Sequence, residues 1–396
     1  MDIRQPHLCG MSLFDIQTGL TGLGFDPGPC DGMYGPLTRD AVRKCQAAYR
    51  LGVSGVPGPE IRRLVTQRLP AFRVTTRARA GQSLQGVARE LNTTVEAIVE
   101  GNRRKRYEDV FPGEQLLVHK RAAAVLDGGE LRGPEWTFVA RPMETAASMA
   151  ADACAARGCF GIVSVPTNQR EAAGDMIRQA SRAGLRGIVL EVADSDLDDD
   201  TAWAYLRFVK FVARACRKAG LQLAVGVSVH TRPPGECHSH SPGHAVWRPN
   251  GYDLEDVGAA ANIVLIDVRD ARDPEAFRNS IAWTCKFIPR WKLMAAIELR
   301  PYHMDESGAR PMSRDDLIKL RARHVVREGI DDSTGLPYLA YRARGAVRQL
   351  WLENSASLGR KLHTVNRLNI LGAAFRGAAD AEEQVLAEIG RRFIIM

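Results

Sequence analysis

The strongest constraint on the fold is a regular alternation of apolar, strand-like segments with helix-like segments, which runs from Trp136 to the C-terminus. Strands this apolar, when joined by helices, are typical of a parallel sheet that is buried on both faces. About 260 residues of such alternation favour an eight-fold α/β barrel of the TIM type over an open doubly wound sheet. No glycine-rich phosphate fingerprint follows an early strand, which also argues against a dinucleotide-binding fold. The expected strands are 137–141, 161–167, 187–193, 221–229, 262–267, 293–299, 349–353 and 370–375.

Residues 1–70 predict a separate, small all-α bundle, because Gly and Pro turns followed by a helical pattern occur twice. This region resembles the peptidoglycan-binding domain found at the ends of many wall hydrolases. The resemblance rests on LGF at 23–25, Asp31-Gly32, Gly35-Pro36, Thr38, Ala41, Gln46, Leu51, Gly55 and Gly58-Pro59. It implies glycan contacts at Asp31 and Tyr34. The alternative is that Asp31 and Thr38 only satisfy the backbone amides of turns and helix starts.

Residues 71–120 predict a second module, with a strand at 72–75, helices that begin at Ser83 and Thr94, and a closing strand at 115–119. This βααβ order resembles the LysM module. The resemblance rests on Val74, Gly81, Ser83-Leu84, Val87-Ala88, Thr94, Asn102, Pro112-Gly113, Leu116 and Val118. It implies that N-acetylglucosamine chains bind in a groove between two loops. The implied contacts are Gly81, Gln82, Ser83, Leu84, Asn102, Pro112 and Gly113.

The net charge of +8 and the isoelectric point near 9.2 favour an acidic partner. Nucleic acid, an anionic membrane and a carboxylate-bearing polymer such as peptidoglycan all fit this charge. The run RRKRY at 103–107 lies in the second loop of the LysM-like module. A solvated basic loop is the favoured interpretation, followed by contact with an acidic wall polymer and then with nucleic acid, since no aromatics are interleaved. Residues 121–135 predict a linker, and the barrel is expected to span 136–396.

The stretch GLRGIVLEVADSDLDDD at 184–200 predicts a buried strand that leads into a cluster of acids. Catalytic groups of such barrels lie at the carboxyl ends of the strands, so Glu191 and Asp194 are the candidate catalytic acids. Because strand residues alternate between faces, Glu191 and Ala193 are expected to point into the barrel. Asp194 would point the other way unless the strand bulges. The later aspartates are expected to cap the next helix or to lie in a solvated loop.

The barrel region resembles glycoside hydrolase family 18, in particular the spore cortex-lytic N-acetylglucosaminidases that carry wall-binding modules ahead of a barrel. The resemblance covers roughly 160–380 and rests on the strand at Gly187, LQLAVGVSV, Tyr252-Asp253 before AANIVLID, IPRWKLMAAIEL with Tyr302, Tyr341 before LWLENSASLGRKL, and ILGAAF. It implies a D-x-x-D-x-D-x-E motif, whose Glu protonates the leaving oxygen while the N-acetyl group of the substrate attacks. Aligned on the glycine, this chain has Arg186, Val189, Glu191 and Ala193, so an alanine replaces the proton donor.

Other positions implied by this resemblance also differ. Residues 266–269 read Ile-Asp-Val-Arg where the family has Met-x-Tyr-Asp. Phe375 stands in place of the terminal tryptophan on which the sugar stacks, and Tyr302 and His230 are candidates for lining the barrel mouth. The first expected strand starts only about thirty residues before Gly161, which predicts a barrel that is incomplete at its start.

The eight cysteines are scattered through apolar patterns, which indicates buried thiols in a reducing compartment. A disulfide among Cys9, Cys30 and Cys45 is the alternative. The loop CHSHSPGH at 237–244 has no standard zinc-site spacing, so we expect a polar loop, and the chain as a whole predicts no metal or cofactor. Neither a signal peptide nor a membrane-spanning apolar run is apparent.

Together these observations predict a protein that binds peptidoglycan or another N-acetylglucosamine polymer through two modules, with a hydrolase-like barrel that has lost catalysis. The first alternative is an active N-acetylglucosaminidase that uses Glu191 or Asp194. The second is a basic nucleic-acid-binding protein. The resemblance alone suggests synthesis in the cytoplasm followed by association with the spore cortex or cell wall.

Overall fold

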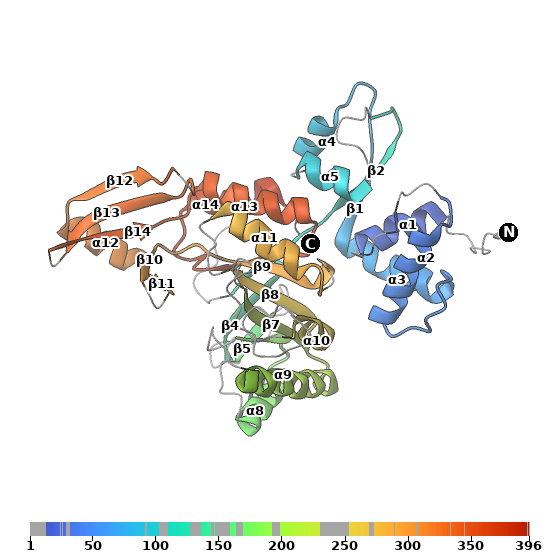
Figure 1. Ribbon diagram of the computed structural model, residues 1–396, viewed down its shortest axis with the longest axis horizontal. Coiled ribbons are helices and arrows are strands. Elements are labelled where there is room, and N and C mark those ends of the chain that lie inside the picture. Colours follow the sequence, from blue (N-terminus) through green and yellow to red (C-terminus); the bar gives the residue numbers. More distant parts are fainter. Residues whose placement is uncertain are drawn as a thin grey trace, which may run out of the picture.

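The computed structural model contains a helical bundle, a βααβ module and a barrel that carries an inserted sheet (Figure 1). In Figure 1 the bundle, in blue, and the inserted sheet, in orange, lie on opposite sides of the barrel. The structure describes residues 13–23, 25, 27–28, 32–91, 93–102, 110–126, 136–143, 146, 159–163, 169–191, 199–229, 253–268, 273–288, 290–305, 308–332, 334–343, 345–393 and 395.

The N-terminal bundle has three helices, as its all-α pattern predicts: α1 (Leu13–Gly22), α2 (Pro36–Ala48) and α3 (Pro59–Phe72). Pro occupies the first position of α2, where its missing N–H costs no helical hydrogen bond. The apolar faces of the helices meet in one core, formed by Leu13, Ile16, Leu20, Leu23, Phe25, Ala41, Val42, Cys45, Ile61 and Val65. The loops between the helices are therefore free to form a surface.

The βααβ module follows directly, because α3 runs into the first strand without a connecting loop. Its elements are β1 (Arg73–Arg77), α4 (Leu84–Glu90), α5 (Val95–Asn102) and β2 (Gln115–His119). The two strands are antiparallel, with Val74 opposite Val118. One face of the strand pair packs on both helices through Leu84, Val87, Ala88, Ile98, Leu116 and Val118.

The barrel is closed and consists of eight parallel strands. They are β3 (Ala122–Val125), β4 (Phe138–Pro142), β5 (Cys159–Val163), β6 (Gly187–Leu190), β7 (Gln222–Val229), β8 (Ile263–Val268), β9 (Leu293–Glu298) and β15 (Gly372–Arg376). Helices of its outer layer are α8 (Arg170–Arg182), α9 (Asp199–Ala219), α10 (Leu254–Ala260), α11 (Pro274–Thr284), α13 (Ser355–Leu368) and α14 (Glu383–Arg392). The predicted TIM-like barrel is confirmed.

Two details of the predicted barrel are wrong. Its first strand, β3, lies within the segment that we expected to be a linker, and it closes the barrel by pairing with β15, so the barrel is not incomplete at its start. The segment 349–353 belongs to a different sheet. Strand β3 reads AAAV, and alanine carries little strand signal. Small residues suit this place, because a Cβ on Gly372 would lie 1.9 Å from the carbonyl oxygen of Ala122.

A buried arginine anchors the start of β3. Arg121 donates from Nε to Asn366 Oδ1 (3.0 Å) and from Nη2 to Asn369 Oδ1 (2.7 Å), which joins the strand to the end of α13. Burial lowers the pKa of Arg121 to about 9. These contacts involve residues more than 240 positions away along the chain, so local sequence cannot predict them.

The barrel interior is filled by side chains and leaves no pore through its described part. The rings of Phe138 and Phe160 lie 4.6 Å apart in its centre, among alanines and single aliphatic residues. Gly187 makes room for them, because a Cβ there would lie 2.4 Å from the Phe160 ring. Chemistry is therefore confined to the mouth, where the strands end.

The inserted sheet lies between β9 and α13 of the barrel. It has five antiparallel strands in the order β11-β10-β14-β13-β12, with one helix, α12, packed on one face. The elements are β10 (Tyr302–Asp305), β11 (Gly308–Pro311), α12 (Arg314–Arg323), β12 (Val326–Ile330), β13 (Pro337–Ala343) and β14 (Ala346–Trp351). Leu320 of α12 packs against Leu339, Tyr341 and Leu350 of the sheet.

Among the described cysteines, Cys45, Cys216 and Cys285 are free thiols. Burial raises the pKa of Cys45 and of Cys216 to about 12, which makes both thiols unreactive. Cys9 and Cys30 lie outside the described residues. None of the described helices combines the length and the apolar character that crossing a membrane requires.

Candidate functional site

Charged side chains gather at the carboxyl end of the barrel. Glu191, Asp267, Glu298 and Arg376 each follow a buried interior residue by two positions, at the ends of β6, β8, β9 and β15. Those interior residues are Val189, Leu265, Ala296 and Ala374. Because strand side chains alternate, the four charged groups point into the mouth of the barrel. Glu191 thus has the inward orientation that alternation predicts.

Arg376 lies between two of these acids. Its Nη2 donates to Glu191 Oε1 at 3.4 Å, and its Nη1 donates to Asp267 Oδ2 at 3.2 Å. Burial alone would lower the pKa of Arg376, but Asp267, Glu191 and Glu298 together raise it above its ordinary value. The guanidinium therefore stays charged and joins three strands across the mouth.

The third acid has its own arginine. Glu298 accepts from Nε and Nη2 of Arg300, both at 2.8 Å, and from the backbone N–H of Arg300 at 3.0 Å. All three carboxylates of the described mouth therefore have a guanidinium partner.

Ala193 and Asp194 lie outside the described residues, as do His230, Arg269 and the whole CHSHSPGH loop at 237–244. Within the described part of the chain, no three metal-ligating side chains come together.

Phe375 and Tyr302 are both buried. Phe375 is fully buried in the layer between barrel and helices, with its ring 5.8 Å from that of Trp136, so its predicted role as a sugar platform is wrong. Alternation directs Arg376, and not Phe375, inward. Tyr302 begins β10 of the inserted sheet, four residues after the end of β9, and is buried opposite Trp351.

In the helical bundle, a buried glutamine holds each of the two inter-helix loops. Gln17 donates to the carbonyl of Met33 (3.0 Å) and accepts from the N–H of Gly32 (2.7 Å). Gln46 donates to the carbonyl of Val56 (3.1 Å) and accepts from the N–H of Gly55 (2.8 Å). The sequence repeat thus has a structural counterpart, because the side-chain amide of one glutamine fixes the first loop and that of another glutamine fixes the second.

Tyr34 joins these two loops, since its hydroxyl donates to the carbonyl of Gly55. Burial raises the pKa of Tyr34, with a smaller opposing effect from Arg39. The loops and the start of α2 also expose apolar side chains, whose exposed fractions are 64% for Met33, 59% for Leu37, 52% for Val53 and 46% for Val56. Fixed loops that expose apolar side chains are typical of a binding surface, and sequence alone does not indicate this one. Asp31 lies outside the described residues.

The described end of the second predicted loop of the βααβ module lies next to the residues that lead into the first. Ala78 accepts from the N–H of Gly113 (2.8 Å) and donates to the carbonyl of Glu114 (2.9 Å). Gly81 and Gly113 both have positive φ, at 73° and 81°, which shapes tight turns on either side. The adjacent Phe111 is 70% exposed, and the sequence pattern does not indicate this aromatic side chain as a possible contact.

Most of the residues predicted to contact glycan on these loops have structural roles instead. Ser83 caps α4 by accepting from the N–H of Gly86, and Leu84 is buried in the core. The side chain of Gln82 accepts from the N–H of Arg79 and donates to Glu90, while Asn102 donates to the carbonyl of Ile98. Pro112 and Gly113 are exposed. Among the described residues of the second loop, Phe111, Pro112 and Gly113 form an exposed turn that a ligand can reach.

One match to a protein-family model covers most of the N-terminal bundle. Residues 12–64 match the peptidoglycan binding domain family. No curated protein sequence matches the chain at a significant level.

Among solved structures, the chain is similar to two spore cortex-lytic enzymes named SleL. The enzyme from Bacillus megaterium is 16% identical with a TM-score of 0.52, and that from Bacillus cereus is 15% identical with a TM-score of 0.54. Each alignment covers 81% of this chain and 87% of the other. A chitinase from Chromobacterium violaceum is 19% identical with a TM-score of 0.52, over 68% of this chain and 98% of that chain. At these identities the similarity establishes a shared fold.

Proposed function

We propose that this protein binds peptidoglycan, or a related N-acetylglucosamine-containing wall glycan, and that its barrel no longer hydrolyses the glycan. The observation that carries the binding proposal is the match of residues 12–64 to the peptidoglycan binding domain family. Association with the spore or cell wall is part of the same proposal.

Support for the binding surface comes from the two loops that Gln17 and Gln46 hold. Sugar rings present C–H faces that pack on apolar side chains, and Met33, Leu37, Val53 and Val56 offer such contacts on a fixed scaffold. A pre-formed surface loses little conformational entropy when it binds.

The βααβ module is proposed as a second glycan site of the LysM kind. Its element order, its neighbouring loops and the exposed Phe111 support this assignment. Two weak sites on one chain raise the overall affinity for a polymer, because the second binding event becomes intramolecular.

The proposed loss of catalysis is supported by the arginine partners at the barrel mouth. Glu191, the inward acid at the end of the fourth barrel strand, is paired with Arg376, and Ala193 replaces the proton donor that the family 18 pattern implies. Glycoside hydrolysis needs one carboxyl group that is protonated. The barrel would then serve as a scaffold or as a further glycan contact.

Co-sedimentation with purified peptidoglycan tests the binding proposal. The wild-type chain should sediment with the wall polymer at raised salt, and the double variant Met33→Ser, Leu37→Ser should remain largely in solution. The matched control, Ile318→Ser, Val347→Ser, removes side chains of similar exposure (57% and 65%) from the inserted sheet and should sediment normally. A wild-type chain that stays in solution and is retained only by DNA would reject the proposal in favour of nucleic-acid binding.

An active N-acetylglucosaminidase is the second candidate, which the inward position of Glu191 favours. Incubation with cortex fragments should release no reducing ends above background. Release that disappears in Glu191→Gln would instead establish the enzyme and overturn the proposed loss of catalysis.

A further inference from the structure

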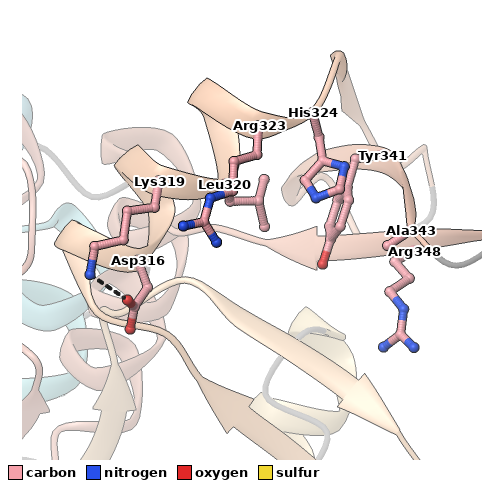
Figure 2. Close-up of a pocket in the computed structure, with 8 residues that line it drawn as sticks. All are labelled: Asp316, Lys319, Leu320, Arg323, His324, Tyr341, Ala343 and Arg348. Atoms are coloured by element: carbon pink, nitrogen blue, oxygen red, sulfur yellow. Dashed lines mark hydrogen bonds and ion pairs between the residues drawn. The ribbon is translucent and has the colours of Figure 1, made fainter.

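The inserted sheet contains a cleft that is separate from the barrel mouth (Figure 2). It has a volume of about 460 Å³ and lies between the C-terminal half of α12 and the hairpin of β13 and β14. That volume is within the range of small-molecule sites. Leu320, Tyr341 and Ala343 form its apolar and aromatic floor, and charged side chains line the rest of it.

The aromatic part of the cleft is held in a fixed orientation. The hydroxyl of Tyr341 contacts His303 Nε2 at 3.1 Å, and His303 Nδ1 lies 2.9 Å from the carbonyl oxygen of Gln349. Since a carbonyl only accepts, Nδ1 carries the hydrogen and Nε2 accepts from the tyrosine. The ring of His324 also lies near Tyr341, with the two ring centroids 5.2 Å apart.

The charges around the cleft are unbalanced. Lys319 is paired with Asp316 at 3.3 Å, and Glu328, on the same sheet face, is paired with Arg321 at 3.1 Å. Arg323 and Arg348 are exposed and have no acidic partner among the residues that the structure describes. Arg348 lies directly opposite Tyr341 across the two strands. Figure 2 shows the two guanidinium groups on either side of the Tyr341 ring.

We propose that this cleft binds an organic carboxylate, namely the lactyl or peptide carboxylates of peptidoglycan. The choice of ligand rests on the proposed function, whereas the class of ligand follows from the cleft itself. A guanidinium donates two parallel hydrogen bonds to a carboxylate, and two unpaired guanidinium groups provide such donors on both sides. The apolar and aromatic floor favours an anion that carries a hydrocarbon part, and this distinguishes the ligand from free phosphate.

The position of His324 allows a local test in the full-length chain. Histidine labelled with carbon-13 at Cε1 gives a separate signal for each imidazole, and the variant His324→Gln identifies the signal of the cleft. The disaccharide of N-acetylglucosamine and N-acetylmuramic acid carries one carboxylate, whereas chitobiose has similar sugars and none. We expect the first to shift the His324 signal and the second to leave it unchanged.

Two double variants decide whether the arginines of the cleft are responsible. Arg323→Gln, Arg348→Gln should raise the dissociation constant read from the His324 signal at least tenfold. Arg327→Gln, Arg342→Gln removes the same charge from exposed positions on the opposite face of the same sheet and should change it less than twofold. Equal losses in both variants, an unaffected constant in the first, or an equal shift with chitobiose would each overturn the assignment.

Inorganic phosphate and wall sedimentation separate the remaining outcomes. Phosphate that shifts the His324 signal at lower concentrations than the disaccharide would overturn the preference for a carboxylate. If the signal does not respond while the chain still sediments with peptidoglycan, only the cleft assignment fails. If the wild-type chain does not sediment with peptidoglycan, the proposed function fails as well. Failure of the cleft assignment and failure of the proposed function are therefore distinguishable.

Discussion

The barrel mouth and the cleft of the inserted sheet both use arginine, but they use it in opposite ways. At the mouth, Arg376 and Arg300 are paired with the three inward acids, so the charges are satisfied within the protein. In the cleft, Arg323 and Arg348 project from the surface without an acid of their own in the described part of the chain. The position of a site in the fold therefore does not determine its role. The role depends on which partners the charged groups of the site have.

The largest effect is expected from removing the arginine that bridges the mouth. Arg376→Ala leaves Glu191 and Asp267 close together without a counter-charge, and should lower the free energy of unfolding by about 2 to 3 kcal/mol. Urea denaturation measures this change. Arg178→Ala breaks an exposed i,i+3 pair with Asp175 and should cost less than about 0.5 kcal/mol, so equal losses would contradict a special role for Arg376.

A smaller loss is expected when one acid of the mouth is neutralised. Glu191→Gln keeps the shape of the side chain and removes the charge that faces Arg376, which should lower the free energy of unfolding by about 1.5 kcal/mol. Asp267→Asn in the Arg376→Ala background should cost much less than in the wild type, because the two groups act as one network. Strict additivity in that double-mutant cycle would show that the mouth is not a network.

The aromatic support of the cleft should contribute less than the mouth. Tyr341→Phe removes the hydroxyl that donates to His303 and should lower the free energy of unfolding by about 1 kcal/mol. Thermal unfolding gives this value, and the His303 signal should shift at the same time. An unchanged His303 signal would show that the hydrogen bond does not order the floor of the cleft.

The smallest effect on stability is expected from the arginines of the cleft themselves. Arg323→Gln, Arg348→Gln removes two charges without acidic partners, so the free energy of unfolding should change by less than about 0.5 kcal/mol. Urea denaturation of this double variant and of Arg376→Ala under the same conditions compares the stabilities of the two regions directly. A loss as large as that of Arg376→Ala would mean that both regions use arginine for stability.

Much of the fold follows from local sequence pattern. The apolar strands β4 to β9 and β15 have the length and spacing of barrel strands, and alternation correctly orients Glu191. Strand β3 is not predicted because three of its four residues are alanines, which carry little strand signal, and because its pairing depends on the small residue Gly372. Strand β14 has a strand pattern, but pattern alone does not decide which sheet a strand joins.

The sites were less predictable, because they depend on contacts between distant residues. Glu191 and Arg376 are 185 positions apart along the chain and meet only when the barrel closes, so no local sequence pattern predicts their contact. Phe375 was expected inward, but the register of β15 turns it outward and places Arg376 at the mouth. Phe111 was overlooked because an isolated aromatic gives no signal until its exposure is known.

The pairing of β3 with β15 also determines the order in which this chain can fold. The bundle and the βααβ module are built from contacts between neighbouring segments, so both can form while the rest of the chain is still being synthesised. Strand β3 has no complete set of neighbours until residues 372–376 have been made. The modules proposed to bind glycan therefore fold early, and the barrel remains an open sheet with exposed edges until β15 has been synthesised.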